Sequence, residues 1–210
     1  MIKKIAIGLG VVVVLLLVVI ATRPSTFEVK RSLQMGAPPE IVYAHVIDFR
    51  EWARWSPWDQ MDPKMTKTYS GAETGVGSKY AWAGDRDTVG SGSMTIETAK
   101  PSEAIGIKLE FTVPFATTNQ TDFAFTPAAG GTNVTWSMKG TNDFMGKAFS
   151  LVMDMDKMVG ADFEKGLATL KTHAEAAAKK AADEKAAAEK AAADAAAAAA
   201  AAPAADAGTP

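Results

Sequence analysis

The sequence has no cysteine and only two histidines among its 210 residues. Without cysteine the chain cannot form disulfides, zinc–thiolate sites or a cysteine nucleophile. With His45 and His173 as the only imidazoles, a histidine-based catalytic or metal site has few possible members. The formal net charge is −2 and no long basic run is present, so we do not expect the chain to bind nucleic acid.

The sequence also lacks a recognisable catalytic motif. Gly71, Gly75 and Gly77 are not followed by a Lys-Ser pair that opens a helix, so they do not form a phosphate-binding loop. His45 and Asp48 have i,i+3 spacing and could act as a general-base pair, but an ordinary role for His45 on a helix surface is favoured. We therefore predict no catalytic residue, no cofactor and no metal site.

What the sequence does contain is an uncharged apolar run near its start. Residues 5–22 would span roughly 27 Å as a helix, close to the ~30 Å hydrocarbon core of a bilayer. The run is longer than that of a secretory signal, and Ile20-Ala21-Thr22 is a poor cleavage site, so an uncleaved anchor is favoured. Lys3 and Lys4 lie closest to the span, which favours a cytoplasmic N-terminus and a domain outside the cytoplasm.

After the anchor, the sequence consists of short alternating runs separated by glycine- and proline-rich turns. A period of two predicts strands, and this spacing is typical of an antiparallel meander. A short helix is predicted over residues 39–49, because proline is favourable at a helix start. The predicted strands cover residues 26–35, 66–69, 78–83, 88–99, 104–113, 117–126 and 132–139.

A long amphipathic helix is predicted over residues 144–170, because apolar residues recur there every three or four positions. They are Met145, Phe149, Val152, Met155, Val159, Phe163, Leu167 and Leu170. A long helix that follows a run of strands predicts an α+β fold with the helix laid across a sheet. Gly160 and Gly166 cost the helix about 1 kcal/mol each relative to alanine, which indicates close approach to the sheet or a less stable helix.

The C-terminal segment is almost all alanine with glutamate, lysine and aspartate, which predicts a helical tail with no large apolar residue to bury. Glu175 and Lys179 have the spacing of a favourable helical ion pair. Residues 203–210 are expected to be disordered. The predicted organisation is therefore an anchor at 1–22, a folded domain at 23–173 and a low-complexity tail at 174–210.

Several segments between residues 27 and 173 match one known pattern in order. They are Gln34–Tyr43 with Asp48, Trp52-Ala-Arg-Trp55-Ser-Pro-Trp58, Tyr69–Gly77, Gly92–Ile96, Thr132–Met138 and Phe144–Lys147. Together they resemble the START-like, SRPBCC superfamily, and within it the bacterial polyketide cyclase/dehydrase and lipid-transport-like proteins with an N-terminal membrane segment. The resemblance implies a helix-grip fold, in which a curved antiparallel sheet wraps around the long C-terminal helix and leaves a cavity between them.

Inward-facing apolar side chains would line such a cavity. The candidates are Tyr43, Trp55, Tyr80, Trp82, Met94, Leu109, Phe111, Phe123, Phe125, Trp136, Met138, Phe149, Met155 and Val159. The cluster of Trp52, Trp55 and Trp58 could be a ligand platform or a membrane contact, but a hydrophobic plug over the end of the core is favoured. The methionines of the long helix, Met145, Met153, Met155 and Met158, fit a cavity lining and a plain core equally well.

Because this superfold hosts lipid carriers, hormone receptors, cyclases and chaperone-associated modules, the resemblance leaves the activity open. The favoured hypothesis is a membrane-anchored module that binds a hydrophobic small molecule or lipid. The second is a cyclase or dehydratase, for which Tyr43, Tyr80, Glu110 and Asp122 are loose candidates for polar groups in the cavity. The third is a ligand-free interaction module whose tail reaches a protein partner.

Overall fold

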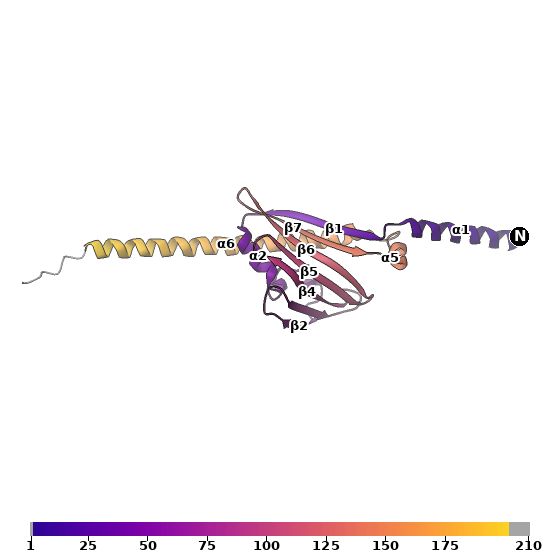
Figure 1. Ribbon diagram of the computed structural model, residues 1–210, viewed down its shortest axis with the longest axis horizontal. Coiled ribbons are helices and arrows are strands. Elements are labelled where there is room, and N and C mark those ends of the chain that lie inside the picture. Colours follow the sequence, from indigo (N-terminus) through magenta and orange to yellow (C-terminus); the bar gives the residue numbers. More distant parts are fainter. Residues whose placement is uncertain (1, 202–210) are drawn as a thin grey trace, which may run out of the picture.

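The computed structural model describes residues 2–201, with side chains to residue 198. Figure 1 shows a curved antiparallel sheet crossed by one long helix, with α1 projecting from one end of the domain and the helical tail from the other. The α+β helix-grip fold predicted from the sequence is confirmed. The segment predicted to be disordered, 203–210, lies outside the described residues.

The sheet has seven strands in the order β1-β7-β6-β5-β4-β3-β2, and every neighbouring pair is antiparallel. Consecutive strands from β2 to β7 are joined as a meander, and β1 closes the other edge by pairing with β7. The predicted strands are confirmed, three of them with the predicted bounds. The strands are β1 Thr26–Met35, β2 Thr66–Gly71, β3 Ser78–Ala83, β4 Ser91–Lys100, β5 Ala104–Val113, β6 Thr117–Ala128 and β7 Gly131–Thr141.

One face of the sheet, called the inner face here, carries the apolar residues of every strand. In the register, Ile105 pairs with Phe123, Phe123 with Trp136, and Trp136 with Arg31. Because side chains alternate along a strand, these partners all point to the same side. The helices cover this inner face, since α6 contacts β1 and β7, and α2 contacts β6 and β7.

The helices that cover the sheet are short except for α6. Helices α2, α3 and α4 each contact α6, so they form one layer with it. Proline opens both α2 and α4, as expected from its fixed φ angle. The helices are α1 Ile2–Thr22, α2 Pro39–Ile47, α3 Trp52–Trp55, α4 Pro57–Met61, α5 Phe144–Phe149 and α6 Met155–Ala201.

The prediction of one continuous helix from 144 to 170 is wrong, because the segment forms two helices separated at residues 150–154. Asp143 caps α5, with its carboxylate accepting a hydrogen bond from the backbone N–H of Gly146 at 2.7 Å. Asp154 starts α6 in the same way, accepting from the backbone N–H of Lys157 at 3.2 Å. Aspartate is a favoured N-cap residue. Asp154 therefore begins a second helix, although the apolar spacing continues through this segment without interruption.

The break divides the predicted apolar stripe into two halves with different environments. Phe163, Leu167 and Leu170 lie in the core, whereas Met145, Phe149 and Val152 are exposed. The close approach indicated by the two glycines of the helix is confirmed. A Cβ on Gly166 would lie 2.8 Å from the Trp136 ring, and one on Gly160 would overlap the Arg31 guanidinium.

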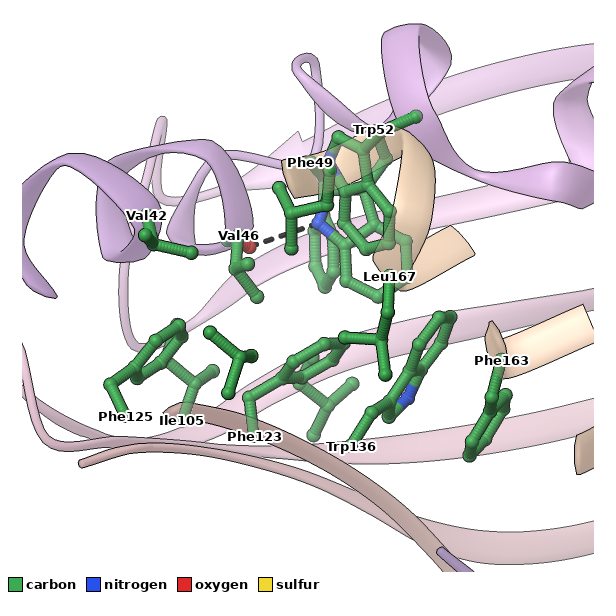
Figure 2. Packing of buried hydrophobic residues seen from close by; sticks show 14 of the residues in the cluster. Val42, Val46, Phe49, Trp52, Ile105, Phe123, Phe125, Trp136, Phe163 and Leu167 are labelled. Atoms are coloured by element: carbon green, nitrogen blue, oxygen red, sulfur yellow. Dashed lines mark hydrogen bonds between the residues drawn. The ribbon is translucent and has the colours of Figure 1, made fainter. Parts of the chain in front are cut away.

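The middle of the sheet–helix interface is filled by aromatic rings (Figure 2). Trp136 stacks on Phe163 with ring centroids 4.0 Å apart and an interplanar angle of 6°. Trp52 and Trp55 meet Trp136 edge-on, and their indole N–H groups donate to the backbone carbonyls of Val46 and His45 at 2.9 and 3.1 Å. Their burial and satisfied hydrogen bonds make these two tryptophans part of the hydrophobic plug.

The alanine-rich segment continues α6 without a break to Ala201, so the predicted helical tail is confirmed over the described residues. Ala174 is fully buried and Ala178 packs against the core, so the core extends beyond the predicted end of the domain at residue 173. Glu175 pairs with Lys171 rather than with Lys179, and it accepts a hydrogen bond from the backbone N–H of Gly36 at 2.6 Å. Further along, lysines pair with acids four residues later, at Lys179–Asp183, Lys180–Glu184, Lys185–Glu189 and Lys190–Asp194.

Candidate functional site

An open cavity of about 500 Å³ lies between the start of β1 and the linker that joins α5 to α6. Its walls mix apolar side chains with charged and hydroxyl groups, and the linker supplies five of the fourteen lining residues. The residues that line it are Arg23, Pro24, Thr26, Phe27, Glu28, Val29, Asn142 and Ser150–Asp156. The helix break that the sequence analysis missed therefore builds one wall of this cavity.

Hydrogen bonds hold the two sides of the cavity together at its rim. The Arg23 guanidinium donates to the backbone carbonyl of Ser150 at 3.1 Å, which ties the chain after α1 to the linker. The backbone N–H of Asn142 donates to the carbonyl of Ser25 at 2.8 Å, which joins the end of β7 to the start of β1. These contacts place the cavity directly beside the end of α1.

Arg31 clamps the N-terminal end of α6 behind the cavity. From the inner face of β1 its guanidinium reaches Glu164 at 2.7 Å and Asp156 at 2.9 Å, and it also donates to the backbone carbonyl of Asp156 at 3.0 Å. The hydrogen bonds to Asp156 and Glu164 raise the pKa of Arg31, and the bond from Arg31 lowers the pKa of the Asp156 carboxyl below its ordinary value of 3.8. Gly160 leaves room for the guanidinium.

This clamp predicts how acid affects stability. Because the folded-state pKa of Asp156 is lowered, its contribution is fully present above the ordinary value of 3.8 and is lost as the pH falls below that value. We expect the difference in Tm between the wild type and Asp156→Asn to be constant near neutral pH and to shrink below about pH 3.8. Thermal unfolding of both proteins between pH 2.5 and 7 measures it. A difference that stays constant to the lowest pH would show that the ion pair does not stabilise the fold.

The fourteen predicted cavity residues fall into three groups by exposure. Buried in the core are Trp55, Tyr80, Met94, Leu109, Phe123, Phe125, Trp136 and Met138. Half-buried against the core are Tyr43, Trp82, Phe111, Met155 and Val159, and Phe149 is exposed. Of these residues, Met155 lines the 500 Å³ cavity. Contact of the others with a ligand stays a prediction.

The 500 Å³ cavity lies beside the end of α1, and of the fourteen predicted residues only Met155 is part of its lining. The aromatic middle of the interface is filled by side chains that contact one another, and the open volume is at the N-terminal end of α6. Three methionines of the predicted Met-rich face, Met145, Met153 and Met158, are exposed, so they belong neither to the core nor to a closed interior. Met153 lines the cavity from the linker.

Two polar features of the inner face were missed by the sequence analysis. Asn119 is buried beside Gly140 and Phe27, and its side-chain oxygen has no hydrogen-bond partner among the described residues. Lys67 forms an ion pair with the buried carboxylate of Asp59, and burial lowers the pKa of Lys67. The alternation of side chains along a strand places both residues on the inner face. Asn119 alternates with Thr121 and Phe123, and Lys67 is the register partner of Trp82.

The acidic groups considered for a cyclase do not face the interior. Glu110 and Asp122 occupy the strand positions between inner-face residues, and they pair with the surface groups Lys108 and Gln120. The hypothetical pair of His45 with Asp48 is also wrong, because the imidazole Nδ1 of His45 lies 3.2 Å from a carboxylate oxygen of Glu51. No cluster of three metal-binding side chains occurs in the part of the chain that the structure describes.

Comparison with known proteins agrees with this architecture. Residues 26–175 match the protein family described as polyketide cyclase / dehydrase and lipid transport. The comparison with curated proteins gave no match.

Solved structures share the fold at low sequence identity. A protein from Chromobacterium violaceum is 19% identical with a TM-score of 0.51, over 72% of this chain and 99% of that one. The Aha1 dimer from Colwellia psychrerythraea is 15% identical with a TM-score of 0.51, over 71% and 96%. The di-domain ARO/CYC StfQ of the steffimycin biosynthetic pathway is 12% identical with a TM-score of 0.55, over 73% of this chain and 52% of that one. These likenesses concern the fold.

Proposed function

The chain belongs to the polyketide cyclase / dehydrase and lipid transport family, and from this membership we propose that it is a membrane-anchored module that binds a hydrophobic small molecule or lipid. The observation that carries the proposal is the cavity of about 500 Å³ beside the end of α1. This volume is within the range of small-molecule sites, which are concave and mostly apolar with a few polar groups.

The composition of the cavity suits an amphipathic ligand. Phe27, Leu151 and Met153 supply apolar surface, and Arg23 supplies a cation at the rim. The lining also includes the polar side chains of Asn142 and Ser150, whose oxygens can accept a hydrogen bond from a ligand hydroxyl or N–H group.

The proposal also places the protein in a bacterial inner membrane, with α1 as its anchor and the domain on the periplasmic side. In support, α1 is a helix of 21 residues, long and apolar enough to cross a bilayer, and only 6% of its most apolar window is buried by the rest of the chain. The anchor would hold the cavity close to a source of apolar ligands. The cyclase alternative has less support, because Glu110 and Asp122 face away from the interior.

Native mass spectrometry of the full-length protein, extracted in mild detergent, tests ligand binding. We expect one apolar molecule per chain in the wild type. Leu151→Trp places an indole in the linker wall and should reduce the occupied fraction at least tenfold, as expected when a ligand site is sterically filled. Val76→Trp is the matched control, because it adds the same ring at an exposed turn between β2 and β3.

Three outcomes would be informative. Loss of the ligand from Leu151→Trp alone supports the site. Equal occupancy in all three proteins would contradict the location of the site, and three empty proteins would contradict the binding function. In the last case the filled aromatic core would favour an interaction module.

A further inference from the structure

The exposed apolar side chains of the domain are concentrated in one segment. Outside α1, the exposed large apolar residues of the described chain are Met61, Tyr69, Val76, Phe115, Phe144, Met145, Phe149, Val152, Met153 and Met158. Five of these ten lie between residues 144 and 153, in α5 and its linker. Met145 is 71% exposed and Val152 is 81% exposed, which is unusual for side chains with so much apolar surface.

This segment lies at the point where α1 enters the domain. Helix α5 contacts α1, and the ammonium of Lys147 donates to the backbone carbonyl of Ala21 at 3.4 Å. Only three residues separate the end of α1 at Thr22 from the start of β1. Figure 1 shows α5 beside the base of α1, at the end of the domain from which α1 projects.

We propose that α5 and its linker, residues 144–153, form an apolar platform that inserts into the headgroup region of the bilayer spanned by α1. This rests on the proposed function, because it requires α1 to be a membrane anchor. The position of the platform favours a bilayer as its partner. Lipid surrounds the end of a membrane-spanning helix, so it would contact a segment that projects beside that end. Apolar residues of interfacial helices lie at that depth.

The charges around the platform indicate that the contact does not depend on anionic lipid. The cations near it are Arg23, Arg31, Lys147 and Lys157, and the acids are Glu28, Asp143, Asp154 and Asp156. Lys157 is paired with Asp154 at 3.3 Å. Since four cations are balanced by four acids, apolar burial rather than attraction to negative headgroups would hold the platform in place.

The platform would also determine where the cavity opens. Residues Ser150 to Met153 belong to the platform and line the cavity. With the platform in the headgroup region, the mouth of the cavity meets the lipid, and an apolar ligand could enter without crossing water. The binding module would then draw its ligand from the membrane that anchors it.

Single-cysteine labelling tests the platform, and the chain has no native cysteine to interfere. Full-length Met145→Cys and Val152→Cys would each carry an environment-sensitive nitrobenzoxadiazole label, in vesicles of phosphatidylcholine with or without doxyl lipids. Val76→Cys is the control, since it is exposed but lies in the turn between β2 and β3. Val14→Cys reports the middle of α1.

We expect shallow doxyl lipids to quench the Met145 and Val152 labels at least threefold more than the Val76 label, and deep doxyl lipids to quench the Val14 label. If the Val14 label is quenched but the Met145 and Val152 labels emit as in water, the platform is wrong and the anchor stands. If the Val14 label is not quenched, the anchor itself fails. The same measurement is repeated with phosphatidylserine added to the vesicles, and platform labels that are quenched only with this anionic lipid would overturn the apolar contact proposed here.

Discussion

Replacing Trp136 with alanine is expected to lower the free energy of unfolding by about 3–5 kcal/mol, the range for removal of a buried aromatic side chain. Trp136 is buried at the centre of the sheet–helix interface, where it stacks on Phe163 and meets Trp52, Trp55 and Trp58 edge-on. Each such aromatic pair adds about 0.5–1.5 kcal/mol beyond its buried area. Alanine would remove all these contacts and leave a cavity.

Trp136→Phe is the matched control for this prediction. Phenylalanine keeps a ring that can stack on Phe163, and it removes the indole N–H, which has no hydrogen-bond partner among the described residues. Because a buried donor without a partner is itself unfavourable, we expect Trp136→Phe to lose less than half of the stability lost by Trp136→Ala. Denaturant unfolding of the full-length chain in mild detergent, followed by the emission of the four remaining tryptophans, measures both losses.

Similar losses for the two variants would contradict this account, since they would show that the stacked ring contributes little. A loss below 1 kcal/mol for Trp136→Ala would indicate that the neighbouring helices close over the gap. Either result would also weaken the interpretation of Gly166 as the position that lets α6 approach the Trp136 ring.

The strands could be predicted because their pattern depends on local alternation. Ile105, Ile107 and Leu109 repeat with a period of two and face a core, and β5 has the predicted bounds. Strict alternation also fixes the opposite face, so the outward position of Glu110 was already implied by its neighbours Leu109 and Phe111. This alternation makes Glu110 a poor candidate for a polar group inside the fold.

The break between α5 and α6 could not be read from apolar periodicity, because the spacing continues through residues 150–154. The available signal was Asp154, a favoured N-cap residue that lies inside the apolar stripe. The cavity depends on that break and on long-range contacts, such as the bond from Arg23 to Ser150, which no local pattern reveals. The position of the cavity therefore could not be predicted from the sequence.

Deletion of residues 2–22 is expected to move the protein almost completely from the membrane fraction to the soluble fraction. In this segment the run from Ile5 to Thr22 is free of charge, and each leucine, isoleucine or valine at the centre of a span favours insertion by about 0.3–0.6 kcal/mol. The uncharged run holds thirteen such residues, which offsets the cost of its glycines and makes spontaneous release from a bilayer negligible.

Carbonate extraction followed by intact-mass measurement tests this prediction and separates an anchor from a cleaved signal. An anchor gives a full-length chain of 22.1 kDa that stays in the pellet, whereas a signal gives a shorter, extractable chain. Replacing Val13 and Val14 with lysine is the matched control, because it keeps the length of α1 but places two charges at the centre of the span, each costing about 2.5–3.5 kcal/mol. If both the full-length chain and the deletion are soluble, α1 is not a membrane span, and the bilayer would no longer be the ligand source beside the cavity.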